Sequence, residues 1–443
     1  MQVVARRGAI RNFETVLGAI GVLALIITAI IITGWNPLPN VTDWWKKVAD
    51  NAGKLSEPQT TWDERVGGQP SAAVIAGSAT IVVMRGTVEA RGLSSGTVLW
   101  TKEADWAAVA GDGDAMVVVI GRRGQGVKAL DPGSGAEKWK EDEGVGAWTY
   151  RNTVLTLSCG GLSDCTLTAR APKDGAQIWK STVPGIGRTL NGANSDLLGT
   201  RLKSDTYDDA VRAVPGSIPA MLGFPIEQRV QVVDTNSGKR LRQEEASNTT
   251  RVVVVGGRVL ISTAAPKDGS CRYTLEARDP STGKQVWKKE GFDLHTSSGA
   301  GCEQRKDPAG SDVVVIATRG DNRDVFLSPR DGREMWVGAV GDEIVAADGQ
   351  YGLVKIDGGR KLLVVNLIKG GKAWEQEIPA KADVAVTRWA ILVRDDAGGK
   401  VWAYTPDSGR LLLEAKTTSD VLGVGEDGLM IGRGRTIGYL PFA

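Results

Sequence analysis

Short apolar runs recur from about residue 62 to the end of the chain, and polar segments separate them. Examples are residues 81–83, 117–119, 252–255 and 313–315, which are rich in valine and isoleucine. β-Branched residues in runs this short favour strands, whereas helix-length patterns with a period of 3.6 residues are missing between them. The pattern predicts an all-β chain of many short strands.

The polar turns between these runs also repeat. Each ends in a glycine, and six of the eight copies carry a tryptophan four residues later. The turn glycines are Gly96, Gly135, Gly175, Gly238, Gly283, Gly332, Gly370 and Gly409, and the tryptophans are Trp100, Trp139, Trp179, Trp287, Trp336 and Trp374. Glycine supplies the left-handed conformation that closes such a hairpin. A period of about forty residues that holds four short strands is typical of a β-propeller blade.

The best preserved copies of the repeat resemble a known family. Residues 277–287 read ARDPSTGKQVW and residues 129–139 read ALDPGSGAEKW. Both segments resemble the tryptophan-docking motif of pyrroloquinoline-quinone (PQQ)-like propellers, and the resemblance covers residues 62–443. In that family each docking tryptophan wedges against the neighbouring blade, so the resemblance implies a structural role for the six tryptophans.

The number of blades follows less directly from the repeats. Residues 421–442 supply three strands after the eighth turn, and residues 61–66 are able to supply a fourth. Literal counting gives nine units, whereas the resemblance implies eight blades. We predict an eight-bladed propeller, with nine blades as the alternative, closed by pairing of the two chain ends so that no sheet edge stays open.

An uncharged apolar segment precedes the repeats. Residues 16–35 read VLGAIGVLALIITAIIITGW, which is long enough to cross a membrane as a helix. Arg6, Arg7 and Arg11 precede it, which places the N-terminus in the cytoplasm by the positive-inside rule. A cleaved signal peptide is the alternative, but no small-residue cleavage pattern follows the segment.

The chain therefore divides into four predicted regions. These are a basic cytoplasmic N-terminus (1–15), a transmembrane signal anchor (16–35), a juxtamembrane amphipathic helix with a linker (36–61), and an extracytoplasmic propeller (62–443) with an insertion at 205–227. The predicted location is a bacterial-type cytoplasmic membrane, with the propeller outside the cytoplasm.

The charge balance and the rarity of histidine narrow the possible functions. The chain has 54 Lys and Arg residues against 52 Asp and Glu residues, which weighs against a nucleic acid as its partner. His295 is the only histidine, and we interpret it as a surface-loop residue. Acidic fragments such as 112–114 lack the full spacing of a calcium loop, so we predict no metal site there. The glycines of 121–126 are not followed by a helix and indicate a hairpin tip instead of a phosphate site.

Four cysteines in an exported domain are expected to be oxidised. Cys159 and Cys165 flank a predicted hairpin tip, so we expect them to pair with each other. This leaves Cys271, at the start of a strand, to pair with Cys302 in the long loop 292–310.

The catalytic relatives in the family are quinoprotein dehydrogenases, which by resemblance need a quinone site, calcium ligands and often a pair of adjacent cysteines. This chain has no adjacent cysteines and no recognisable ligand cluster. We therefore predict no cofactor, no metal and no enzymatic activity.

One interval between turn glycines is 63 residues, and the excess lies at 205–227. Residues 206–214 are able to form a short helix, and the apolar residues that follow stand among three prolines, an irregular pattern for a strand. These apolar residues are Ile218, Met221, Leu222, Phe224 and Ile226. One interpretation is that they fold back over a blade edge or plug the central funnel; the other is that they form an exposed docking loop for a membrane partner.

These observations predict a membrane-anchored propeller that acts as a non-enzymatic protein-interaction scaffold, an accessory subunit of a larger membrane complex. The comparison is with non-catalytic relatives such as the propeller lipoprotein of the outer-membrane β-barrel assembly machine. A propeller that senses a ligand or binds cell-wall saccharide in its funnel is the alternative, and a quinoprotein dehydrogenase is the third possibility.

Overall fold

The computed structural model describes residues 60–443, except 123–124, 151, 161–163, 185–219, 227, 248, 296–301, 303–309 and 312. Within these residues the chain forms 36 β-strands and one short 3₁₀ helix, Gly113–Ala115. The predicted segments 1–15 and 16–35 and nearly all of 36–61 lie outside the described residues. No helix in the described part of the chain is both long enough and apolar enough to span a membrane.

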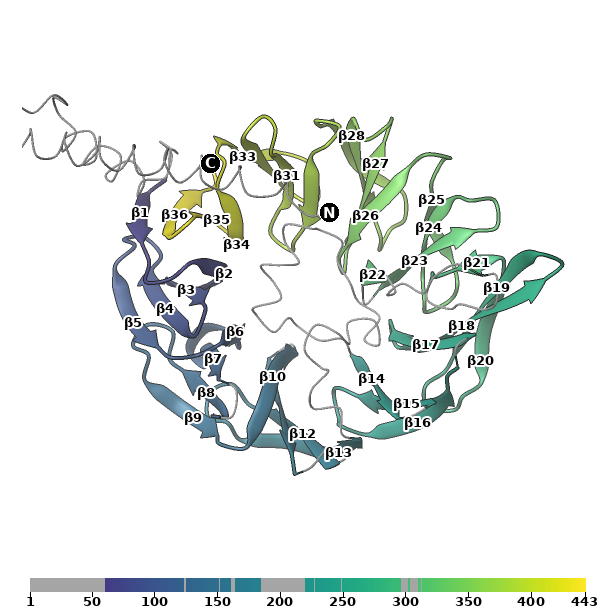
Figure 1. Ribbon diagram of the computed structural model, residues 1–443, viewed down its shortest axis with the longest axis horizontal. Helices are drawn as coiled ribbons and strands as arrows, with labels where there is room; N and C mark the ends of the chain where they lie inside the picture. Colours follow the sequence, from purple (N-terminus) through teal and green to yellow (C-terminus); the bar gives the residue numbers. More distant parts are fainter. Residues whose placement is uncertain are drawn as a thin grey trace, which may run out of the picture. The chain divides into compact units, whose positions relative to one another are not determined.

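The strands form nine antiparallel sheets arranged around a ring (Figure 1). We call these sheets blades and number them in chain order. Blade 1 contains β2 (Pro70–Ala76), β3 (Ala79–Met84), β4 (Thr87–Gly92) and β5 (Val98–Lys102); blade 2 contains β6 (Trp106–Ala110), β7 (Val117–Gly121), β8 (Val127–Leu130) and β9 (Glu137–Glu141). Blade 3 contains β10 (Gly144–Tyr150), β11 (Thr153–Cys159), β12 (Asp164–Arg170) and β13 (Gln177–Pro184); blade 4 contains β14 (Met221–Ile226), β15 (Arg229–Asp234) and β16 (Arg240–Glu245).

The remaining blades follow the same order. Blade 5 contains β17 (Thr250–Val255), β18 (Arg258–Lys267), β19 (Ser270–Arg278) and β20 (Gln285–Glu290); blade 6 contains β21 (Phe292–Asp293), β22 (Gly310–Ser311), β23 (Val314–Arg319), β24 (Asp324–Leu327) and β25 (Glu334–Val337). Blade 7 contains β26 (Glu343–Ala347), β27 (Tyr351–Ile356), β28 (Lys361–Asn366) and β29 (Lys372–Glu377); blade 8 contains β30 (Asp383–Val386), β31 (Ile391–Asp395), β32 (Lys400–Tyr404) and β33 (Leu411–Lys416). Blade 9 contains β34 (Asp420–Val424), β35 (Gly428–Arg433), β36 (Thr436–Pro441) and β1 (Trp62–Arg65).

The hydrophobic pattern explains where each strand lies in its blade. Every residue of β3 and of β7 is buried, because both faces of these strands are covered by neighbouring blades. In the outermost strand β5 only Trp100 is buried and the other four residues are exposed. The continuous apolar runs of the sequence are therefore middle strands, and the polar segments that carry the tryptophans are outer strands.

The core of the molecule is divided into apolar layers between neighbouring blades. Nine clusters of buried residues occupy these junctions, one for each pair of adjacent blades. Ile81 of blade 1 and Val118 of blade 2 share one cluster, for example, and Leu422 of blade 9 and Val82 of blade 1 share another. The ring is held together by contacts between faces of successive sheets, since no single centre collects the apolar residues.

The two ends of the chain meet in blade 9, which confirms the predicted closure. Strand β1 pairs with β36, so that Trp62 lies opposite Tyr439 and Arg65 lies opposite Thr436. The prediction of eight blades is wrong, because the described chain forms nine sheets. The ninth blade has no turn glycine of its own: its outer strand comes from the other end of the sequence, where the repeat is hard to recognise.

Arginines at the end of the third strand of a blade connect it to the preceding blade. The guanidinium group of Arg91 donates to the backbone oxygen of Arg65 at 3.1 Å and to that of Gly96 at 2.7 Å. Arg278 donates to a carboxylate oxygen of Glu244 in blade 4 at 3.0 Å. These buried or half-buried ties fix the junctions in addition to their apolar contacts.

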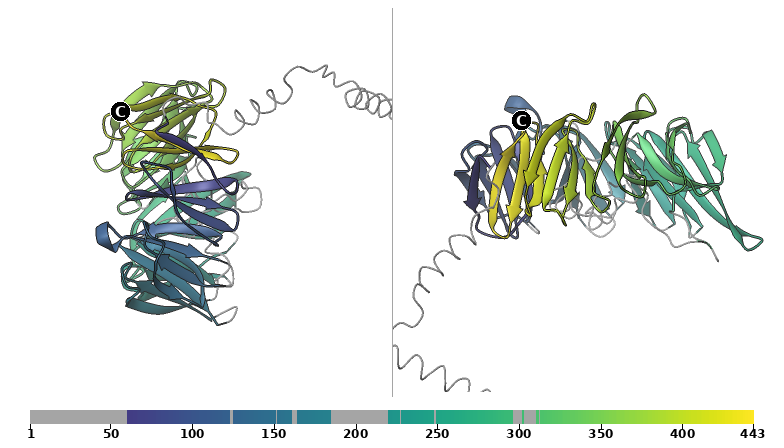
Figure 2. Two further views of the ribbon diagram at one scale, coloured as in Figure 1. Left: turned by 90° about the vertical axis from the view of Figure 1, so that its left-hand side faces the viewer. Right: turned by 90° about the horizontal axis from the view of Figure 1, so that it is seen from above.

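The hairpin of β18 and β19 is longer than the others and extends beyond its neighbours (Figures 1 and 2). Beside it, the inner strand of blade 6 is divided into two short pieces, β21 and β22, which both pair with β23. The chain between these two pieces contains Cys302, which bonds to Cys271 of the long hairpin. The disulfide therefore joins blade 5 to the interrupted edge of blade 6.

Candidate functional site

Four of the predicted docking tryptophans lie in one repeated geometry. Their indole N–H groups donate to the backbone oxygen of the proline in the turn of the next blade. These bonds are Trp100 to Pro132 (2.9 Å), Trp139 to Pro172 (2.7 Å), Trp287 to Pro329 (2.9 Å) and Trp374 to Pro406 (2.9 Å). Such indoles join two blades and leave no polar group for chemistry.

The turn glycines are needed because the indoles lie directly against them. Gly135 has a φ of +68°, and a Cβ atom built on it would lie 2.6 Å from Cγ of Trp100. The same crowding is found for Gly175, Gly332 and Gly409 against the tryptophan of the preceding blade. Trp179 covers Gly238 in this way as well. A side chain at these positions would strain the backbone and displace the indole.

Trp336 departs from this arrangement. Its ring lies 5.9 Å from that of Phe326, centroid to centroid, and a Cβ atom on Gly370 would meet no indole. A small residue lies opposite the tryptophan on the neighbouring strand in the regular copies, for example Ala129 opposite Trp139 and Val364 opposite Trp374, whereas the large Phe326 lies opposite Trp336. The large Phe326 ring fills the junction itself, against Gly352 of blade 7, and leaves no room for the indole.

Two docking residues are missing from the prediction. Trp62 of β1 donates to the backbone oxygen of Leu93 at 2.7 Å and lies against Gly96, so it docks blade 9 on blade 1. Arg242 places its guanidinium group against Gly283, where the other blades have an indole, and pairs with Glu244 at 2.6 Å. Trp62 follows no turn glycine in the sequence, so the repeat does not reveal it.

The turn aspartates cap the loops that receive the indoles. One carboxylate oxygen of Asp131 accepts from the backbone N–H of Ser134 and from its hydroxyl group, both at 2.9 Å. Asp279 accepts from Thr282 in the same way, at 2.8 and 3.0 Å. The hydrogen bond from the backbone N–H has the largest effect and the bond from the hydroxyl group the next largest. Together they lower the pKa of both carboxyl groups below 3.8. The aspartates are ionised turn caps, and their bonding is entirely local.

The insertion at 205–227 differs from the predicted docking loop. Residues 221–226 form strand β14, which pairs with β15 along its whole length, including Pro225 opposite Val230. Met221, Leu222 and Phe224 are buried, and Leu222 and Phe224 pack in the cluster between blades 3 and 4. The exposed docking loop is therefore wrong for these three residues, which form blade core. Ile226 ends the strand, and Ile218 and the predicted helix 206–214 lie outside the described residues.

The irregular pattern of this segment misled the prediction because of Pro225. A proline is tolerated in a strand at the edge of a sheet, where its missing N–H removes no ladder bond. Strand β14 is the inner edge strand of blade 4, in the order β14-β15-β16.

Both predicted disulfides are confirmed. Cys159 and Cys165 lie opposite each other on β11 and β12, with their Cα atoms 4.0 Å apart. Cys271 and Cys302 have their Cα atoms 5.5 Å apart and close a much longer loop. No described cysteine is free.

His295 takes part in a polar network that the sequence did not suggest. Its Nδ1 atom lies 3.1 Å from a carboxylate oxygen of Asp293, and its Nε2 atom lies 2.8 Å from the hydroxyl oxygen of Thr318. The Thr318 hydroxyl donates to Asp324 at 2.6 Å. This network holds the end of β21 against β23 and β24, at the point where the chain leaves the interrupted inner strand.

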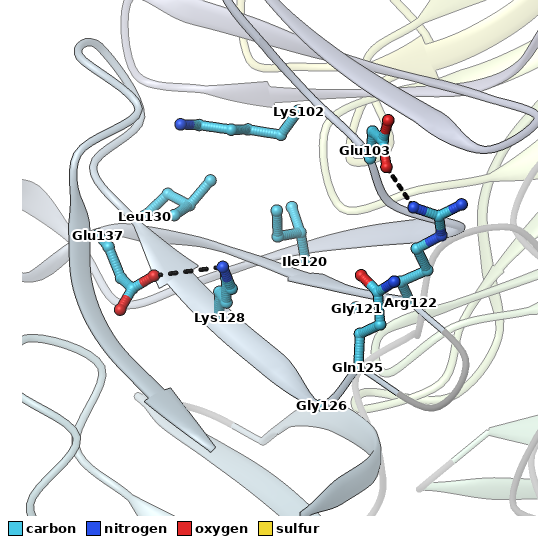
Figure 3. Close-up of a pocket in the computed structure, with 10 residues that line it drawn as sticks. All are labelled: Lys102, Glu103, Ile120, Gly121, Arg122, Gln125, Gly126, Lys128, Leu130 and Glu137. Carbon is cyan, nitrogen blue, oxygen red and sulfur yellow. Dashed lines mark hydrogen bonds and ion pairs between the residues drawn. The ribbon is translucent and has the colours of Figure 1, made fainter. Parts of the chain in front are cut away.

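A pocket lies at the junction of blades 1 and 2 (Figure 3). Its volume is 280 Å³, and the buried residues Ile120 and Leu130 supply its apolar part. Charged side chains surround this part: Lys102, Glu103, Arg122, Lys128 and Glu137. Arg122 pairs with Glu103, and Lys128 pairs with Glu137 at 3.5 Å, as the dashed lines in Figure 3 show. No sequence pattern predicts this pocket, because its residues come from four different strands and from the loops between them.

The residues of the described chain do not fit a quinone–calcium site of the kind that catalytic relatives use. No three histidine, cysteine, aspartate or glutamate side chains in that part of the molecule converge as ligands for a metal ion. Cys159 and Cys165 are 6 residues apart and Cys271 and Cys302 are 31 residues apart, so neither disulfide joins adjacent cysteines.

Comparison with known proteins identifies a family. The model of the PQQ-like family described as outer membrane protein assembly factor BamB matches residues 43–289 and 226–383, which together span more than half of the 443-residue chain. No curated protein matches the chain.

Several solved structures are similar to the chain at low identity. BamB from Moraxella catarrhalis is 17% identical, with a TM-score of 0.37 over 82% of this chain and 99% of that protein. The quinohemoprotein alcohol dehydrogenase ADHIIG from Pseudomonas putida HK5 is 13% identical, with a TM-score of 0.38 over 85% of this chain and 72% of that enzyme. The computationally designed protein Ika8 is 15% identical, with a TM-score of 0.38 over 87% of this chain and 98% of the design.

Proposed function

The chain belongs to the PQQ-like family of outer membrane protein assembly factor BamB, and from this premise we propose that it is a non-enzymatic protein-interaction scaffold. We further propose that it is an accessory subunit of a larger membrane complex. The observation that carries the proposal is that the motif residues of this family serve to join blades here. The indoles dock on the turn glycines of the next blade and the aspartates cap those turns, so these residues maintain the shape of the ring.

The outer strands supply a surface suited to a protein partner. In three blades the residue just before the docking tryptophan is apolar and exposed: Leu99, Ile178 and Val286. Their strands β5, β13 and β20 are the last members of their sheets, so their outer backbone groups have no neighbouring strand within the sheet. Exposed apolar side chains on an open sheet edge favour contact with another chain.

We propose that residues 16–35 anchor the chain in the cytoplasmic membrane, with the propeller on the extracytoplasmic side. The two disulfides support this location, because such bonds persist in oxidising compartments and are rare in the cytosol. Protease added outside intact cells is expected to remove the propeller and to spare the N-terminus. Protection of the propeller would reverse the orientation.

Co-purification tests the scaffold directly. The full-length chain, extracted in mild detergent, is expected to carry one or more membrane or exported proteins identifiable by mass spectrometry. The double variant Ile178→Lys/Val286→Lys is expected to lose them, since it places charge in the exposed apolar contact. A matched control, Gln177→Lys/Gln285→Lys, adds the same charges one residue away on the same strands and is expected to retain the partners. Equal recovery from both variants would exclude this surface.

The absence of enzymatic activity is a separate part of the proposal. The purified chain, supplied with PQQ and calcium, is expected to show neither stoichiometric binding of the quinone nor dye reduction with alcohols or sugars. Tight binding of PQQ would falsify the non-enzymatic scaffold.

A further inference from the structure

Two junctions between blades carry the same charged residues at equivalent positions. Lys102 and Lys289 each stand two residues after a docking tryptophan, Trp100 and Trp287. Glu137 and Glu334 each stand two residues after a turn glycine, Gly135 and Gly332.

The equivalent arginines are Arg122 and Arg319. They follow Val118 and Val315 by four residues, and these valines lie opposite Leu130 and Leu327 in their sheets. The junction of blades 1 and 2 and the junction of blades 5 and 6 thus share a lysine, an arginine and a glutamate.

At the junction of blades 5 and 6 these three residues form a closed cluster. Glu334 lies 3.2 Å from Lys289 and 3.2 Å from Arg319, so one carboxylate neutralises cations from both blades. All three side chains are about one-quarter to one-third exposed, which strengthens such pairs compared with fully solvated ones.

At the junction of blades 1 and 2 the same cluster is open. Lys128 occupies the position that the apolar Val325 has in blade 6. Its Nζ atom forms an ion pair with Oε2 of Glu137 at 3.5 Å. Arg122 pairs with Glu103 instead. Lys102 consequently forms no ion pair with any residue of the described chain, although its equivalent Lys289 has one.

The pocket at this junction is complementary to an anion with an apolar body. It presents three cations and two carboxylates, so it carries one positive charge in excess. Ile120 and Leu130 are buried beneath the charged side chains, and Figure 3 shows Lys102 extended above Leu130. The volume of 280 Å³ exceeds the roughly 150 Å³ at which an apolar cavity accepts a benzene ring.

We propose that this pocket binds a carboxylate carried on an apolar group. The carboxylate pairs with Lys102 as Glu334 pairs with Lys289, and the apolar group packs on Ile120 and Leu130. The source is either an acidic or C-terminal residue of a partner protein or a free organic acid, which share this chemistry. This proposal does not depend on the scaffold function, because the pocket would bind the carboxylate whether a protein or a small molecule supplies it.

Ligand-observed ¹⁹F NMR with the full-length chain in mild detergent tests the proposal. The probe is 3-(4-fluorophenyl)propanoate, and its neutral amide is the matched control ligand. The acid is expected to bind up to about fivefold more tightly than the amide, since Lys102 is exposed and a solvated ion pair contributes at most about 1 kcal/mol. Lys102→Gln is expected to lower the affinity for the acid to that for the amide, and Lys102→Arg is expected to retain most of it.

The second junction provides the matched control variant. Lys289→Gln removes an equivalent lysine that already has a partner, so it is expected to leave probe binding unchanged. Equal affinity for the acid and the amide would overturn the proposal. So would binding of the acid that survives Lys102→Gln, since detergent or another site would then hold the probe.

Competition distinguishes the sources. A peptide with an internal Phe-Asp, capped at both ends, displaces the probe if the natural ligand is an acidic side chain of a protein. A peptide that ends in a free Phe carboxylate displaces it alone if a chain terminus is recognised. Binding of the probe without competition from either peptide assigns the pocket to a small organic acid. Each of these results supports the carboxylate site.

Discussion

Replacement of Trp62 by alanine tests whether the ends of the chain hold the ring closed. Trp62 is 9% exposed, donates to the backbone oxygen of Leu93 at 2.7 Å, and covers Gly96 of blade 1. A buried indole removes about 200 Å² from water, which corresponds to about 5 kcal/mol of transfer free energy. We expect Trp62→Ala to lower the free energy of unfolding by about 3–5 kcal/mol, the usual range for this substitution in a core.

Trp100→Ala is the matched comparison. Trp100 is 7% exposed, donates to the backbone oxygen of Pro132 and packs against Gly135, so it makes the same two contacts as Trp62. Its junction joins blades 1 and 2, which are consecutive in the chain. Its replacement is expected to cost a similar free energy of unfolding. The two variants should differ in local opening, because only Trp62 lies on a strand whose neighbour is the other chain end.

Urea denaturation and limited trypsin digestion measure the two effects. In the native ring the backbone of Arg65 is paired with Thr436 in the β1–β36 ladder, which protects the peptide bond after Arg65 from trypsin. Trp62→Ala is expected to expose the bond after Arg65 to trypsin under native conditions, and Trp100→Ala is not. A loss of less than about 1 kcal/mol in Trp62→Ala, or equal cleavage after Arg65 in both variants, would refute the reasoning.

Three further predictions concern the turns and the disulfides. Gly135→Ala is expected to destabilise the ring more than Gly86→Ala, by at least about 1 kcal/mol in urea denaturation, because both glycines have positive φ but only Gly135 lies against an indole; equal losses would show that the indole moves aside freely. Loss of the Cys271–Cys302 disulfide is expected to cost about 4 kcal/mol and loss of Cys159–Cys165 about 2 kcal/mol, since the first closes the longer loop; the order of the urea midpoints of the two Cys→Ser pairs decides this. Asp279→Asn is expected to lower the melting temperature at pH 7 and to have a smaller effect at pH 3. Folding lowers the pKa of Asp279 below 3.8, so the ionised carboxylate stabilises the folded state above pH 3.8. This stabilisation is lost as the pH falls through the lowered pKa. A melting difference that does not shrink in acid would argue against an ionised cap.

The repeat in the sequence was sufficient to predict the four-stranded blade, and the family resemblance implied the contacts between blades. Trp100 and Trp139 make the contact that the resemblance implied. The failures have local physical reasons. The ninth blade was hidden because its outer strand, with Trp62, is far from its other three strands in the sequence. Trp336 fits the pattern in sequence, but the bulk of Phe326 opposite it decides its position.

The candidate sites were predictable to different degrees. Proximity along the chain and elimination predicted both disulfides correctly. The apolar residues around Phe224 were misassigned, because a proline-containing strand at a sheet edge has the same composition as an irregular loop. The pocket depends on which cation each carboxylate selects. The two junctions differ at Lys128, whose equivalent in blade 6 is Val325, and this difference is found only when the junctions are aligned by strand register.

The closing strand has a consequence for the order of folding during synthesis. Arg435 bonds to the backbone of Val66 across 369 residues of chain, so blade 9 forms only after all eight preceding blades have been synthesised. Contacts this distant in sequence are slow to form, because the entropy of closing so long a loop is lost before any contact is gained. Until then, Trp62 and the open faces of blades 1 and 8 remain accessible to water and to other chains. A nascent propeller of this kind is therefore most exposed to misassembly just before β36 is made, and a truncation of only β36 leaves β1 without its partner strand.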